Sequence, residues 1–367
     1  MKRRPSIIPT TAPIVVAASI ASIASFATAA TADRELHRRD GAASLVVERV
    51  TAAGEGVRAT VVSDGLRFEQ VVPWDRVASI DPDEAGRLEV GIERGIEKGT
   101  LVWRGRSRMN RGDAVLAQSA FDSAFEAGIQ PGSELGSIAI EGLVRAAIAA
   151  GDGSRVLGEA MLVSEFPAGV VEPSRFPRGE RLVDPVTGLV ISVPPVAEDG
   201  DRSRMLEWFR RVPAPDARAS LRRSLFARLV DGSGPPEESG ANLADGERFL
   251  FRLTELDAED PARRERTRRA LLAAAADAPV WRNAWIRFFA GRGTLARETD
   301  PELRMRGVLD LIHVIALESS APPVLRRASL RLAVETLRDL GRSESAAVLE
   351  SILIAERADD ALPENLP

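Results

Sequence analysis

The fold of this protein is decided by residues 111–152, which read RGDAVLAQSAFDSAFEAGIQPGSELGSIAIEGLVRAAIAAGD. Small and apolar side chains recur here every three or four positions, the spacing of one face of an α-helix. They form two such faces: Ala114, Ala117, Ala120, Phe121, Ala124 and Phe125 on the first, and Ile138, Ile140, Leu143, Val144, Ala147 and Ile148 on the second. The stretch therefore predicts two successive amphipathic helices, with the Gly-Asp pairs at 112 and 151 at their ends.

A helix, a Gly-Asp turn and a further helix with small and aromatic residues at i and i+4 resemble a degenerate tetratricopeptide-type hairpin. The resemblance covers residues 101–166, with a third expected helix at 156–166, and has an echo at 324–356. It implies an array of helical hairpins over 99–166. The Trp-x2-Leu-Gly start of that family does not occur in register, so the resemblance implies a fold and no binding residues.

Residues 202–358 repeat the helical pattern after a connection at 167–201 that is rich in proline and glycine. Eight helices are expected, at 202–210, 215–231, 244–256, 261–276, 279–290, 301–318, 323–340 and 343–358. Asp260-Pro261 and Asp300-Pro301 each place an N-cap before a proline at the first helical position. Within the connection, we expect residues 184–189 to form an ordered turn that packs partly against helices. Residues 359–367 are expected to be a disordered tail.

Residues 33–98 have the period of two that β-strands show. Strands are expected at 45–50, 57–63, 66–72, 73–80 and 88–96, and Asp64-Gly65 is a two-residue hairpin turn. Five short strands in so few residues predict a small β-barrel or a curled sheet. The predicted fold class is therefore mainly α, a helical-hairpin array preceded by a small N-terminal β domain.

The first 32 residues indicate export. Lys2-Arg3-Arg4 precede an apolar run from Ile14 to Phe26 and the small-residue stretch 27–32, which is the pattern of a secretory signal peptide. We expect cleavage between Ala32 and Asp33, and a periplasmic or secreted product. The alternative is an uncleaved membrane anchor over residues 12–32, a stretch without charge that is close to the ~20 residues needed to span a bilayer.

Composition narrows the function further. The chain has no cysteine, so no disulfide framework stabilises it after export. Loss of the three basic residues of the leader lowers the net charge from −5 to −8, which argues against nucleic acid as a partner. Lys2 and Lys98 are the only lysines, so a Schiff-base mechanism has one candidate after cleavage.

Catalytic motifs are missing from the sequence. His37 and His313 are the only histidines; we expect His37 to lie near the mature terminus and His313 to be a core or boundary residue of a helix. Residues 54–59 match the dinucleotide-binding fingerprint but lead into a strand, and so predict a hairpin turn. Residues 81–92 begin like a calcium loop but end in isoleucine where the loop needs glutamate, and predict an acidic turn. No catalytic, metal or cofactor residue is proposed.

Two helical segments have both a structural interpretation and an alternative, functional one. The basic run Arg263-Arg264-Glu265-Arg266-Thr267-Arg268-Arg269 predicts a solvated helix face, and its alternative is a site for an acidic partner or an anionic lipid surface. Trp281, Trp285 and Phe288 lie at i, i+4 and i+7, with Phe289 alongside, and predict core rather than an aromatic binding platform. Trp74 and Trp103 are expected to seal the junction between the β domain and the first helices.

These observations favour an exported, non-catalytic interaction or scaffold protein of the periplasm or cell envelope. It would bind a protein or peptide partner through its helical surface, as helical-repeat proteins do. The alternative is a hydrolase that cleaves envelope polysaccharide with two carboxylates about 5–10 Å apart.

Overall fold

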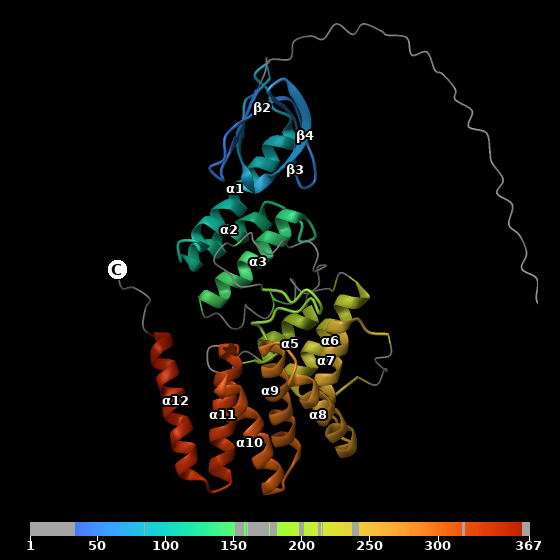
Figure 1. The fold of residues 1–367 in the computed structure, drawn as a ribbon, viewed down its shortest axis with the longest axis vertical. Helices are drawn as coiled ribbons and strands as arrows, with labels where there is room; N and C mark the ends of the chain where they lie inside the picture. Colours follow the sequence, from blue (N-terminus) through green and yellow to red (C-terminus); the bar gives the residue numbers. More distant parts are fainter. Residues whose placement is uncertain are drawn as a thin grey trace, which may run out of the picture.

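The computed structural model describes residues 34–83, 85–150, 158, 160, 176, 182–197, 202–211, 214, 216–236, 242–317 and 320–361. The predicted leader, almost all of the helix expected at 156–166 and residues 362–367 lie outside this set. In the described part the protein is mainly helical, 62 % helix, with one five-stranded antiparallel sheet. Figure 1 shows the sheet and α1 at one end of the molecule, α2 and α3 next, and the remaining helices in a long array.

The described part contains eleven α-helices. They are α1 (Val90–Met109), α2 (Ala114–Glu126), α3 (Glu134–Ala149), α5 (Arg202–Arg211), α6 (Ala217–Asp231), α7 (Asp245–Thr254), α8 (Pro261–Ala275), α9 (Val280–Arg297), α10 (Pro301–Ala316), α11 (Pro323–Asp339) and α12 (Ser343–Ala361). Two short 3-10 turns, η1 (Trp74–Arg76) and η2 (Glu255–Asp257), precede β5 and follow α7. The two helices expected from residues 111–152 and the eight expected after Arg202 are confirmed, although α9 continues seven residues beyond its expected end.

The sheet is open, so the barrel alternative is wrong. Its strands are β1 (Arg34–Arg38), β2 (Leu45–Ala52), β3 (Gly56–Ser63), β4 (Leu66–Pro73) and β5 (Val77–Ile80). Their order is β4-β3-β2-β1-β5, which leaves β4 and β5 as the two edges. The strand expected at 88–96 does not exist, because α1 begins at Val90. The expected boundary between residues 98 and 99 therefore falls inside α1, which belongs to the β domain and to the helices alike.

Glycine allows α1 to lie against the sheet. An added Cβ at Gly95 would lie 2.5 Å from the Trp74 ring, and one at Gly99 would lie 2.1 Å from the Trp74 carbonyl oxygen. Trp74 is buried and donates from Nε1 to the Ala53 carbonyl at 3.1 Å. The expected sealing role of Trp74 is thus confirmed. That of Trp103 is wrong, since its ring is exposed and lies 5.7 Å from the Arg39 guanidinium.

The Asp64-Gly65 hairpin is confirmed. Ser63 pairs with Leu66, and both turn residues have positive φ, 51° and 77°. Two consecutive positive φ values define a type I′ turn, whose twist matches that of the flanking strands. Strand β1 was not expected, because Arg34–Arg38 reads RELHR and has one apolar side chain, Leu36, which is fully buried.

Helix α3 connects two hydrophobic cores. Leu135, Ile138 and Leu143 pack with the sheet, α1 and α2 in one core. Ile140 and Val144 belong to the other, which is built from residues 182–196 and the C-terminal helices. Because α3 is buried on opposite sides, it contributes residues to both cores, and Phe125 of α2 also packs against both.

The proline-rich connection packs against the helices in its described part, as expected. Leu182, Leu189 and Val193 are buried in the second core. The turn at 184–189 is closed by Asp184, whose carboxylate accepts from the Thr187 amide at 2.8 Å and the Thr187 hydroxyl at 2.7 Å. Residues 182–197 are therefore an ordered part of the domain.

A buried ion pair holds this turn in place. Arg222 of α6 donates to the Thr187 carbonyl at 3.0 Å and to the Glu247 carboxylate of α7. Burial opposes ionisation of Glu247, but hydrogen bonds from Arg218 and the charge of Arg222 outweigh it, so the pKa of Glu247 is lowered. The connection, α6 and α7 are thus linked through one carboxylate.

Candidate functional site

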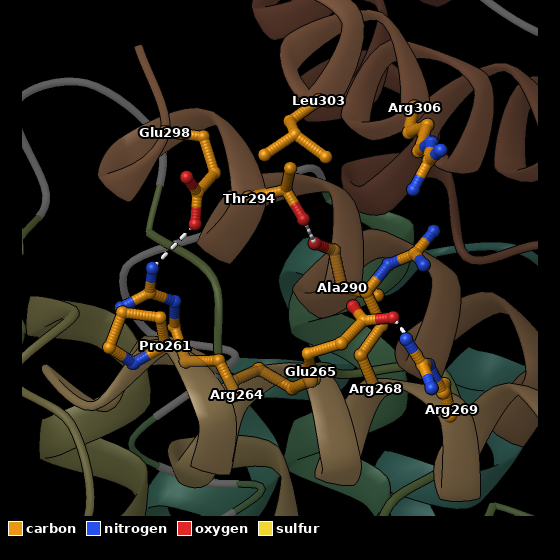
Figure 2. A pocket seen from close by; sticks show the side chains of 11 residues that line it. Pro261, Arg264, Glu265, Arg268, Arg269, Ala290, Thr294, Glu298, Leu303 and Arg306 are labelled. Carbon is orange, nitrogen blue, oxygen red and sulfur yellow. Dashed lines mark hydrogen bonds and ion pairs between the residues drawn. The ribbon is translucent and has the colours of Figure 1, made fainter. Parts of the chain in front are cut away.

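A cavity of about 340 Å³ lies on the surface of the helical array, and we call it the arginine groove. It is lined by Leu256, Pro261, Arg264, Glu265, Arg268, Arg269, Ala290, Thr294, Glu298, Leu303 and Arg306. Figure 2 shows that α8 supplies one wall, α9 the floor and α10 the opposite side. A cavity of this size lies at the lower end of the range of small-ligand sites.

Local sequence positions the walls of the groove. Asp260 caps α8 by accepting from the Ala262 amide at 2.9 Å, with Pro261 at the first helical position. Asp300 caps α10 in the same way, through the Glu302 amide at 2.8 Å. The floor is low because Ala290 and Thr294 of α9 are small, and the Thr294 hydroxyl is turned back to the Ala290 carbonyl at 2.8 Å. The groove exists because two capped helices lie on either side of small residues.

Two arginines of α8, one turn apart, form the fixed part of the wall. Arg264 donates to Glu298 at 2.5 Å and to the carbonyls of Ala258 and Glu259, both at 2.9 Å. Arg268 donates to Asp310 of α10 at 2.6 Å. Their side chains are 11 % and 20 % exposed, so these ion pairs are largely shielded from water. They join α8 to α9 and α10 at either end of the groove.

Asp310 is a buried carboxylate shared between two arginines. Its Oδ2 accepts from Arg268, and its Oδ1 accepts from Arg287 of α9 at 3.0 Å. A buried carboxylate needs such partners, because an unpaired charge in the interior is strongly destabilising. Asp310 therefore fixes the Arg268 guanidinium at the end of the groove.

Two further arginines that line the groove, Arg269 and Arg306, are exposed. Arg269 pairs with Glu265 at 2.6 Å, but these side chains are 76 % and 42 % exposed, and such surface pairs contribute little to stability. Arg306 of α10 is exposed and forms no ion pair with any residue of the described part. Figure 2 shows the Arg306 guanidinium extending toward that of Arg268. At this site five guanidinium groups, Arg287 included, face three carboxylates, so two positive charges remain uncompensated.

The basic run is therefore only partly the solvated face that was expected. Arg263 pairs with Glu255 at 2.8 Å, and Arg264 and Arg268 are largely buried in ion pairs. Arg266 is exposed and does not line the groove. The sequence could not show this, because the acceptors Glu298 and Asp310 lie more than thirty residues away along the chain.

A second cluster lies on the β domain. His37 Nδ1 is 3.0 Å from the Ser44 hydroxyl, and His37 Nε2 is 3.6 Å from Asp81. The sequence did not indicate this proximity, which arises because β1 pairs with both β2 and β5. All three side chains are exposed on the sheet surface, whereas a serine nucleophile needs a site that excludes water and holds an oxyanion. We assign no catalytic role to the cluster.

The remaining sequence candidates are structural. Trp285, Phe288 and Phe289 are buried and Trp281 is partly buried, so the core interpretation is confirmed. His313 is exposed on α10, with its Nδ1 2.9 Å from the Leu309 carbonyl, so the expectation of a core or boundary residue is wrong. The partial matches to a dinucleotide-binding fingerprint and to a calcium loop are both turns. Residues 53–56 join β2 to β3, and the Asp83 carboxylate accepts from the Arg87 amide at 2.8 Å.

The arginine groove presents positive charge that suits an anionic group. Its carboxylates, Glu265 and Glu298, are each held by a guanidinium, and no histidine lines it. Within the described ranges, no group of three or more histidine, aspartate or glutamate side chains is arranged to hold a metal ion. None of the helices described is both long and apolar enough to span a bilayer.

Comparisons of the chain with protein families, curated proteins and solved structures found no match.

Proposed function

We propose that this protein is an exported, non-catalytic interaction or scaffold protein of the periplasm or cell envelope. It binds a protein or peptide partner through its helical array, which we interpret as a tetratricopeptide-like series of hairpins. The observation that carries the proposal is the arginine groove, a surface cavity with two uncompensated positive charges between packed helices.

The arrangement of the helices supports this interpretation. Helices α9 to α12 pack one against the next in chain order, and α9 also contacts α11. Such stacking leaves long helix faces open to solvent, and these faces are the surfaces that helical-repeat proteins use for binding. Export is proposed from the sequence of residues 1–32 alone.

The alternative, a polysaccharide hydrolase, receives less support. A glycosidase needs one carboxyl group that donates a proton and a second that acts on the sugar or on water. In the groove, Glu298 is 2.5 Å from Arg264 and Glu265 is 2.6 Å from Arg269. No aromatic side chain lines the cavity to stack on a sugar ring.

Affinity capture tests the proposal. The full chain with a C-terminal tag is used to retain proteins from an envelope extract, beside a groove variant, Arg269→Glu with Arg306→Glu, and a control, Arg266→Glu. Arg266 lies on the same helix and is exposed, but does not line the cavity. We expect one protein to be retained by the wild type and the control and lost with the groove variant.

Two further outcomes bear on the proposal. Failure of all three proteins to retain a specific partner would contradict it, and release of reducing sugar from envelope polysaccharide would replace it with the hydrolase. The mass of the protein recovered from the envelope fraction tests export: a chain that begins at Asp33 supports it, and recovery only from the cytoplasm contradicts it.

A further inference from the structure

We propose that the arginine groove binds the carboxylate side chains of an acidic peptide segment, with Arg306 and Arg269 as the contacting residues. This inference rests on the proposed function and names the chemistry of its partner. It commits to a peptide carrying aspartate or glutamate next to apolar residues.

The first argument is the division of the arginines into two classes. Arg264 and Arg268 are anchored, each by a carboxylate at 2.5–2.6 Å, and form a rigid positive wall. Arg269 and Arg306 are exposed, one in a surface pair and one with no ion pair in the described chain. Stability alone explains the first class. It does not explain why Arg306 should extend toward Arg268 (Figure 2), where two like charges repel each other.

The second argument is that an anion placed between these groups removes the repulsion. A guanidinium offers five N–H donors in a planar fork that matches a carboxylate. Arg268 uses its Nη2 for Asp310, and Arg269 uses its Nε for Glu265, so both retain further donors. A carboxylate between Arg306 and these two residues would accept hydrogen bonds from α8 and α10 together.

The third argument concerns the remainder of the lining. Leu256, Pro261, Ala290 and Leu303 give the cavity an apolar part beside the charges. Its volume of about 340 Å³ corresponds to about ten water molecules, enough for the ends of two side chains but not for a large rigid ligand. An acidic side chain and a neighbouring apolar one fit this lining better than a highly charged phosphate group.

Fluorescence anisotropy with defined peptides tests the inference on the full chain. The probe is a labelled twelve-residue peptide in which glutamate alternates with leucine and glycine, and its control has glutamine in place of every glutamate. We expect the glutamate peptide to bind, the glutamine peptide to bind at least about tenfold more weakly, and binding to weaken between 50 and 300 mM salt.

The variants locate the site. Arg306→Gln and Arg269→Gln should each weaken binding about fivefold to tenfold, and Arg266→Gln should leave it unchanged. Because all three residues are exposed, thermal melting should confirm that the variants fold like the wild type. Equal weakening by all three would show attraction by overall charge and would overturn the inference, and so would an absence of any weakening.

The remaining measurements distinguish an acidic peptide from an anionic lipid surface as the ligand. They also distinguish failure of this binding site from failure of the proposed function. Binding to phosphatidylglycerol vesicles without binding to the peptide would overturn the inference in favour of a lipid surface. A partner captured equally by the wild type and the groove variant would leave the interaction protein standing and refute this site. Failure of both capture and peptide binding would refute both.

Discussion

The two halves of this molecule share close glycine packing but differ in the ion pairs that join their helices. In the N-terminal half, helices and sheet approach each other through glycine: an added Cβ at Gly99 would lie 2.1 Å from the Trp74 carbonyl oxygen, and one at Gly142 would lie 2.2 Å from the Phe121 ring. In the C-terminal array, buried carboxylates bind arginines across helices, as Asp310 does with Arg268 and Arg287. Glycine contacts of the first kind also occur in the C-terminal array, where an added Cβ at Gly293 would lie 2.4 Å from the Leu256 carbonyl oxygen, and buried ion pairs between helices are added to them.

This difference has a physical consequence. Close packing is sensitive to added volume and insensitive to pH, whereas buried ion pairs are sensitive to the loss of one partner and to protonation. The N-terminal half also contains buried carboxylates, Asp75 paired with Arg106 and Glu141 paired with Arg145 of the same helix. The two halves thus differ in how much they depend on buried ion pairs. Substitutions in each half can measure the loss of stability that follows from disturbing each kind of contact.

The largest effect is expected from added volume at the sheet. Gly99→Ala should destabilise the protein by about 3 kcal/mol, because the new methyl group meets backbone atoms of Trp74 that cannot move without displacing η1. Gly54→Ala is the control, since no atom lies within 4 Å of its added Cβ. Urea denaturation measures both. A cost for Gly99→Ala below about 1 kcal/mol would show that the glycine contacts are not what holds α1 to the sheet.

Removal of a shared carboxylate should have the next largest effect. Asp310→Ala leaves Arg268 and Arg287 without their common partner and should cost about 2 kcal/mol, less than a fully buried pair because both arginines reach solvent. Asp339→Ala is the matched control: Asp339 pairs with Arg304 between α10 and α11 but lies at the surface, so its loss should cost less than about 1 kcal/mol. Equal losses would contradict the view that burial gives the array its dependence on charge.

Acid should destabilise the array through Glu247. Its pKa is lowered in the folded protein, so its contribution to stability is complete above the ordinary glutamate value of about 4.3 and is lost as pH falls through the lowered pKa. Glu247→Gln cannot be protonated there, and its stability should fall less steeply below about pH 4.5. Thermal melting between pH 7 and pH 3 tests this, with the exposed Glu207→Gln as the control. Identical acid slopes for the wild type and Glu247→Gln would refute it.

The smallest effect is expected at the groove itself. Arg269→Gln removes an exposed i,i+4 pair with Glu265 and should change stability by less than about 0.5 kcal/mol, and even less in high salt. The result matters because the binding proposal needs Arg269 to be free for a ligand. A loss above about 1 kcal/mol would show instead that Arg269 is structural.

Local sequence determined much of the secondary structure. The 3.6-residue period, the Asp-Pro caps at 260 and 300 and the Asp64-Gly65 turn identified α8, α10 and the β3–β4 hairpin, because each depends on neighbours within a few positions. The buried stripe of Trp285 and Phe288 followed from the same periodicity. These features need no knowledge of distant residues.

The strand wrongly expected at 88–96 has an identifiable cause. Residues 88–96 alternate like a strand, but glycines at 91, 95 and 99 recur every four residues and present a smooth helix face. That spacing indicates a helix only when a partner such as Trp74 is known to lie against it. The fifth strand of the open sheet is β1 instead, and α1 packs against β2 and β5.

What the sequence determined by itself is the helices from α2 onward in the described part, the hairpin and the position of the basic run on α8. Only the tertiary structure decided which arginines are anchored by a carboxylate and which are exposed. Arg264 and Arg268 are anchored by Glu298 and Asp310, whereas Arg306 is brought to the same cavity without a partner in the described chain. The physical reason is that ion pairing depends on distance in space, and packing sets that distance independently of separation along the chain.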